Sequence, residues 1–182
     1  MADSSLEVPL FSFPLAAVRV SVDPSGADVL LGAGGFGKVF VGQCRLDESA
    51  TWADVAIKAL RAGGSTEDLE RELKKQASFQ HKNISRLFGV VRDGPLGKLA
   101  AVIELGKGGN LLKRLMDREG PPPSLAQRMQ WSIQLAWAVA YVHDQGSCHA
   151  DISPTQLQPA TSFSKCPIPA GTCRRDRQSR AA

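Results

Sequence analysis

The chain has 182 residues, of which 43% are hydrophobic and 22% charged, an ordinary globular balance with enough length for a core. The net charge of +4 comes from residues 157–182, where five basic residues and one acidic residue occur, so the remainder is neutral. This distribution argues against a nucleic-acid-binding body. No apolar run approaches the roughly 20 residues of a membrane-spanning helix, and Pro14 interrupts the apolar stretch nearest the N-terminus, so a signal peptide is not expected.

The four cysteines are scattered along the chain and form no C-x-x-C pair. Structural zinc sites usually need closely spaced pairs, and disulfide frameworks need a secreted protein. The pattern therefore favours reduced thiols in a cytoplasmic protein.

The N-terminal half predicts a small sheet with one helix. Residues 1–27 form an extension that is either a flexible leader or the source of an extra strand over 17–22. Residues 28–40 predict a strand, a glycine turn and a second strand, and 54–60 predict a third, in which Lys58 has a face of its own.

A helix follows the third strand. Ser65 is a suitable N-cap with Asp68 three residues later, and apolar residues recur every fourth position to about residue 79. Residues 84–92 and 99–105 predict two further strands joined by a turn. The N-terminal half of the chain is thus predicted to contain five strands, with one helix inserted after the third.

The second half is predicted to be helical. Asn110 can cap a short helix to about residue 118, and Ser124 can cap a long helix to about residue 144. The apolar positions of the long helix predict a broad inward-facing stripe: Leu125, Met129, Ile133, Ala136, Val139, Ala140 and Val142. Beyond residue 157 this periodicity is lost, so 158–182 are expected to be a disordered basic tail.

The glycine-rich turn carries the first chemical signal. Gly32, Gly34 and Gly37 fit G-x-G-x-x-G with a trailing Val39, and glycines let backbone N–H groups approach phosphate oxygens closely. Dinucleotide-binding folds use the same spacing but continue into a helix, whereas Lys38 begins a strand here. An ordinary glycine-rich hairpin is the other alternative.

Lys58, in Val-Ala-Ile-Lys, lies 19 residues after Val39. A lysine ammonium on a strand beneath such a turn can neutralise phosphate oxygens, and a carboxylate must fix its direction. Glu72 is the candidate, with Glu70 as a rival that points to another face of the helix. A solvated surface acid is the alternative role for Glu72.

With the hinge-like segment 104–109 and His149-Ala150-Asp151 after the long helix, this order of motifs resembles the protein kinase domain over about residues 28–157. The resemblance implies that Asp151 orients the substrate hydroxyl and accepts its proton, while Lys58 holds ATP. It further implies ATP contacts from Leu31, Gly32, Ala33, Gly34, Gly35, Phe36, Gly37, Val39, Ala56, Lys58, Glu72, Ile103, Glu104 and Gly106.

The sequence departs from the kinase pattern in four places. Ala150 replaces an arginine, and Ser153 replaces the residues that separate serine/threonine from tyrosine kinases. Gln156 takes the place of an asparagine that would bind Mg²⁺, and its longer side chain shifts the amide oxygen. No Asp-Phe-Gly follows it, so we expect a domain truncated after the catalytic loop, with a naturally short protein with a basic tail as the alternative. The helices missing from such a domain would leave the apolar stripe of 125–142 partly uncovered.

The resemblance implies an α+β fold, with a five-stranded antiparallel small lobe carrying one helix and an incomplete helical large lobe. The predicted boundaries are an extension at 1–27, the small lobe and hinge at 28–106, a partial large lobe at 107–157 and the tail. The implied function is phosphoryl transfer from ATP, with Mg²⁺, to a protein Ser/Thr or Tyr hydroxyl, with low activity for this chain. The alternative is a non-catalytic module that binds nucleotide or a partner kinase.

Overall fold

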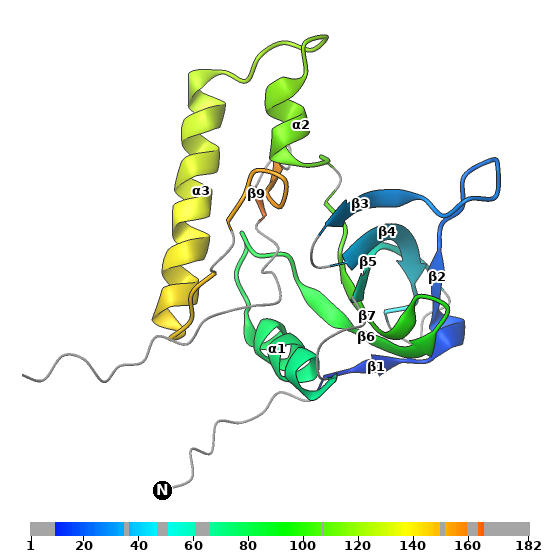
Figure 1. Ribbon diagram of the computed structural model, residues 1–182. Coiled ribbons are helices and arrows are strands. Elements are labelled where there is room, and N and C mark those ends of the chain that lie inside the picture. Colours follow the sequence, from blue (N-terminus) through cyan, green and yellow to red (C-terminus); the bar gives the residue numbers. More distant parts are fainter. Residues whose placement is uncertain are drawn as a thin grey trace, which may run out of the picture. The chain divides into compact units, whose positions relative to one another are not determined.

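The computed structural model describes residues 10–34, 37–46, 51–60, 66–106, 108–149, 152–159 and 164–165, with backbone only at 34, 60, 66, 68, 69, 72, 164 and 165. The chain divides into two compact units (Figure 1). The sheet unit is Met1–Ser78 with Arg86–Leu105, and the helical unit is Phe79–Ser85 with Gly106–Ala182. None of the described helices combines the length and the apolar composition needed to cross a membrane.

The sheet unit is built on one curled sheet whose strand order is β1-β6-β7-β5-β4-β2, with β3 also paired to β4. Its strands are β1 (Ser12–Phe13), β2 (Val18–Val20), β3 (Leu30–Gly34), β4 (Gly37–Cys44), β5 (Ala53–Leu60), β6 (Leu87–Gly94) and β7 (Gly97–Glu104). Every pairing between two of the five strands β3 to β7 is antiparallel, which confirms the predicted five-stranded antiparallel arrangement.

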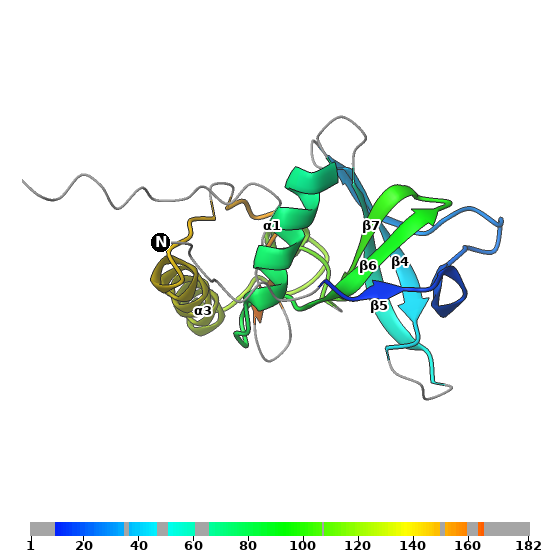
Figure 2. The same ribbon diagram turned by 90° about the horizontal axis from the view of Figure 1, so that it is seen from below.

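Alternate residues of the strands fill two separate cores, one on each face of the sheet. Along β7, Leu99 and Ala101 belong to one cluster, while Ala100 and Val102 belong to the other. The helix α1 (Thr66–Ser78) adds Leu73 to the first cluster and contacts β6 (Figure 2). The face with Ala101 is therefore the α1 face of the sheet.

Residues 10–22, which we call the strap, supply strands to both edges of this sheet. The short 3₁₀ helix η1 (Leu15–Ala17) separates β1, which runs parallel to β6, from β2, which runs antiparallel to β4 (Figure 1). The predicted extra strand within 17–22 is thus present as β2. The parallel strand β1 was not predicted, because two residues show no periodicity.

Two glycines allow the strap to approach closely. A Cβ atom at Gly89 would lie 2.4 Å from the backbone oxygen of Phe11, and one at Gly42 would lie 2.7 Å from that of Arg19. The amide of Val90 donates a 2.8 Å hydrogen bond to that Phe11 oxygen. Any larger residue at 89 would therefore push the strap away from β6.

The helical unit contains α2 (Leu111–Met116), α3 (Leu125–Asp144), β8 (Gln158–Pro159) and β9 (Ser164–Lys165). Both predicted caps are present: Asn110 accepts from Lys113 N, and Ser124 forms a capping box with Gln127. The remaining residues of the predicted disordered tail lie outside the described residues. The four that are described pair as β8 and β9.

The core of the helical unit draws on a segment from the first half of the chain. Phe79 and Ile84 pack with Ala138, Val142 and Leu157. This packing explains why β6 begins at Leu87 rather than at Ile84. It also explains why residues 79–85 belong to the helical unit, although they were predicted within the small lobe at 28–106.

The predicted apolar stripe of α3 is mostly exposed rather than turned inward, which agrees with the expectation that this stripe is left partly uncovered. Leu125, Met129 and Ile133 are 74%, 56% and 47% exposed. The residues of α3 that are buried lie on another face: Gln134, Ala138 and Val142. Periodicity identified an apolar face correctly, but it could not show which face the described part of the unit covers.

The strap generates a stability prediction. Phe13 is 5% exposed in the sheet core, whereas Phe11, two residues earlier, is 58% exposed. We expect Phe13→Ala to lower the free energy of unfolding by about 3–5 kcal/mol because it leaves a cavity. The matched variant Phe11→Ala should cost less than about 1 kcal/mol. Urea unfolding measures both, and equal losses would contradict the assignment of the strap to the core.

The Cys44 thiol generates a pH prediction. Cys44 is fully buried, and burial raises its pKa from 9.0 to about 11. Because the pKa of the Cys44 thiol is higher in the folded than in the unfolded chain, burial of the neutral thiol contributes to stability below pH 9. This contribution is lost as the pH rises toward 11. At pH 8, maleimide should label Cys148, which is partly exposed, well before Cys44. Peptide mass spectrometry checks this, and equal labelling rates would refute it.

Candidate functional site

Two of the predicted phosphate-binding residues, Gly32 and Lys58, lie in one row across four strands of the sheet unit. Gly32 lies opposite Val39, Val39 opposite Lys58, and Lys58 opposite Ala101. Directly opposed residues of antiparallel strands project to the same face. Val39 and Lys58 therefore point to the α1 face, where Ala101 packs with Leu73.

The glycine turn closes the hairpin at one end of this row. Gly34 and Gly37 are cross-strand partners at the ends of β3 and β4, while Gly35 and Phe36 lie outside the described residues. Leu31, Gly32 and Ala33 are exposed on β3. The exposed backbone of this hairpin is two strands away from Lys58, since only β4 lies between β3 and β5.

The next row contains the predicted adenine contacts. Ala56 lies opposite Ile103, and the two are only 4% and 8% exposed. The N–H of Glu104 donates a 2.9 Å hydrogen bond to Arg86 O, so it is engaged within the sheet unit. The Glu104 carboxylate accepts a 3.2 Å hydrogen bond from the Arg86 N–H.

The two glutamates that are candidates to pair with Lys58 both lie on α1. Glu70 forms an ion pair with Arg92 of β6. Glu72 precedes the buried Leu73 on α1, and only its backbone is described. Lys58 itself is partly buried. The rival thus has another partner, and the pairing of Lys58 with Glu72 stays a prediction.

The predicted catalytic loop lies in the helical unit. His149 is buried at 4% exposure, and Asp151 lies outside the described residues. The backbone N–H of Gln156 donates to Ser153 O at 3.0 Å, and the Gln156 side-chain Oε1 atom is buried. Hydrogen bonds from the first turn of α2 to Pro154 O and Leu157 O hold this segment in place.

Sequence reasoning missed Gln158, which contacts the hinge residue Gly106. A Cβ atom at position 106 would lie 1.9 Å from Gln158 Oε1, so the carboxamide occupies the space that glycine leaves open. This oxygen is buried and accepts no hydrogen bond from the described residues. No local signal could have identified it, because 52 positions separate the two residues.

Among the described residues, no three His, Cys, Asp or Glu side chains lie close enough together to hold a metal ion. Mg²⁺ is usually held through one or two carboxylates together with waters and substrate phosphates, whereas Gln156 offers one amide oxygen. Its role as a metal ligand stays a prediction.

Comparison with known proteins finds similarity to protein kinases. The family model described as protein tyrosine and serine/threonine kinase matches residues 27–156. Calcium/calmodulin-dependent protein kinase type 1 of Caenorhabditis elegans is 32% identical over 144 residues, which cover 79% of this chain and 39% of that protein. Aurora/IPL1-related protein kinase 2 of Caenorhabditis briggsae is 31% identical over 128 residues, covering 70% of this chain and 41% of the relative.

A third relative, serine/threonine-protein kinase chk-2 of Caenorhabditis elegans, is 29% identical over 147 residues and is covered over 30% of its length. The chain therefore spans about two fifths or less of the length of these curated relatives. The match begins at residue 27, after the strap.

Proposed function

This chain belongs to the protein tyrosine and serine/threonine kinase family, phosphotransferases that use ATP with Mg²⁺, and from that premise we propose that its sheet unit binds ATP. The single observation that carries the proposal is the row formed by Gly32, Val39 and Lys58. It supports a site with backbone donors from the hairpin and an ammonium group two strands away.

Each part of this row suits one part of the nucleotide. Backbone N–H groups near Gly32 and Gly34 would receive phosphate oxygens, since no side chain stands in the way. The Lys58 ammonium would neutralise the α- and β-phosphates, and the Glu72 carboxylate would orient it. Val39 and Ala56 would pack against the base, while main-chain groups of Glu104 and Gly106 would read its edge.

The reaction proposed for the family member is transfer of the γ-phosphoryl group to a protein hydroxyl. The hydroxyl oxygen attacks the γ-phosphorus, the bond to the bridging oxygen of ADP breaks, and Asp151 accepts the hydroxyl proton. The serine/threonine-protein kinase among the relatives favours a Ser or Thr substrate over Tyr.

Nucleotide binding without turnover is the second candidate function. Apart from Gly106, which belongs to the helical unit, the residues proposed to hold ATP lie in the sheet unit. The proposed base Asp151 lies outside the described residues. Binding and transfer can therefore be separated by experiment. A cytoplasmic location is also a proposal, which the buried, reduced thiol of Cys44 supports.

The ATP site generates a binding prediction. We expect ATP to raise the melting temperature of the 182-residue chain, with a stabilisation of about 2.7 kcal/mol at 100 times Kd. Lys58→Met should weaken ATP binding at least about tenfold, because it removes the charge beside the phosphates. Glu72→Gln should weaken it less, by releasing the lysine. Calorimetric titration with ATP measures each Kd.

Two matched variants serve as controls for this titration. Lys38→Met removes an exposed ammonium from β4, one residue away from Val39 on the opposite face. Glu70→Gln removes the rival carboxylate, which pairs with Arg92 instead. Both should bind ATP as the unmodified chain does. A loss of affinity with Glu70→Gln that equals the loss with Glu72→Gln would contradict the assignment of Glu72.

Turnover separates the two candidate functions. We expect little transfer of radiolabelled γ-phosphate from ATP to a generic protein substrate, since the sequence holds no Asp-Phe-Gly. Transfer in the range of about 1–100 s⁻¹, abolished by Asp151→Asn or Lys58→Met, would instead establish this chain as an active kinase.

A further inference from the structure

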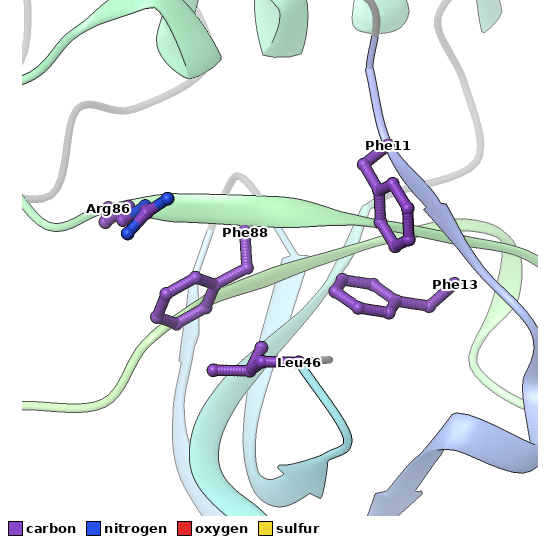
Figure 3. Close-up of a pocket in the computed structure, with 5 residues that line it drawn as sticks. All are labelled: Phe11, Phe13, Leu46, Arg86 and Phe88. Atoms are coloured by element: carbon purple, nitrogen blue, oxygen red, sulfur yellow. The ribbon is translucent and has the colours of Figure 1, made fainter. Parts of the chain in front are cut away.

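An aromatic hollow lies on the face of the sheet opposite α1. Five residues line it: Phe11, Phe13, Leu46, Arg86 and Phe88 (Figure 3). Its volume is about 270 Å³. Phe13 and Phe88 pack with the core cluster of Val55 and Val102, whereas Leu73 of α1 belongs to the cluster on the other face.

The strap builds one wall of this hollow. The rings of Phe11 and Phe13 meet edge to face, with their centroids 4.7 Å apart. Close approach of the strap to Gly89 fixes the backbone of Phe11 beside β6. Because the family match begins at residue 27, this wall comes from a part of the chain outside the matched domain.

The opposite end of the hollow carries a positive charge. The Arg86 guanidinium lies 5.6 Å from the centre of the Phe88 ring, toward one end of the group in Figure 3. In the part of the chain that the structure describes, this guanidinium forms no ion pair or hydrogen bond. Glu104 accepts a bond from the Arg86 main-chain N–H instead. The hollow thus combines apolar walls with a cation that is available to an anion.

The size of the hollow indicates what it can hold. Sites for whole drug-sized ligands usually measure about 300–1,000 Å³, so about 270 Å³ suits one large side chain. Aromatic side chains seated in such hollows commonly anchor protein–protein interfaces. Phe11 at 58% exposure and Leu46 at 36% leave apolar surface for a partner to cover.

We propose that this hollow binds a segment of a partner protein in which a phenylalanine fills the space between Phe11, Phe13 and Phe88 while an adjacent aspartate pairs with Arg86. The apolar walls select the ring, and the unpaired guanidinium selects the acid next to it. This docking site is separate from nucleotide binding, because the row of Lys58 faces the α1 side.

The test uses two isosteric peptides and the full 182-residue chain. The probes are acetyl-Gly-Phe-Asp-Gly-amide and its neutral counterpart acetyl-Gly-Phe-Asn-Gly-amide. In NMR titrations, both should shift the amide signals of residues 11–13 and 86–91. The acidic peptide should bind about fivefold more tightly, as expected for one exposed ion pair. The absence of these shifts at 10 mM peptide, or equal affinities, would overturn the proposal.

Two variants and one control separate docking from folding. Arg86→Gln should remove the preference for the acidic peptide while both peptides still bind. Arg45→Gln is the matched control, because its guanidinium also lies over a ring, 4.7 Å from the Trp52 ring centroid, and Arg45 does not line the hollow. Phe11→Ala should weaken both peptides at least about tenfold with an unchanged fold by circular dichroism. An unchanged preference in Arg86→Gln would overturn the role of the guanidinium.

A second copy of this chain is the competing occupant. Sedimentation velocity distinguishes it, because self-association that Phe11→Ala abolishes would show that the hollow binds another copy rather than a partner segment. A monomer across the accessible concentration range, with peptide binding as described above, supports the proposal.

Discussion

The register between β4 and β5 determines which of their side chains lie on the α1 face of the sheet and which lie on the opposite face. Its eight residue pairs run without a bulge from Gly37 opposite Leu60 to Cys44 opposite Ala53. Because side chains alternate between faces, a slip of one residue would turn Lys58 into the core of Val55 and Ile57. The register therefore decides both which residues are buried and whether an ammonium group shares a face with α1.

The strap extends the sheet unit beyond the N-terminal limit of the matched kinase domain. It pairs with β6 at one edge and with β4 at the other, so that one continuous segment satisfies both exposed edges. The close approaches at Gly42 and Gly89 show that the domain's own strands are shaped to receive it. The same packing leaves an aromatic hollow on the face of the sheet opposite α1.

Local sequence patterns were sufficient to predict most of the elements. The alternation in 54–60 predicted β5, and the caps at Asn110 and Ser124 predicted the starts of α2 and α3, since each signal lies within a few residues of its effect. The motif order in turn identified the family before any fold was known. These successes share one cause, which is that strand alternation and capping depend on neighbouring residues.

The sequence by itself determined the five antiparallel strands, the helix between the third and fourth of them, and the glycine–lysine pattern of a kinase. Only the tertiary structure decided that Ile84 belongs to the helical core, that α3 buries Gln134 and Ala138, and that Gln158 fills the space at Gly106. These outcomes depend on contacts between residues far apart in the chain. A periodic pattern reports that a face is apolar, but what covers it is decided by which distant segment packs there.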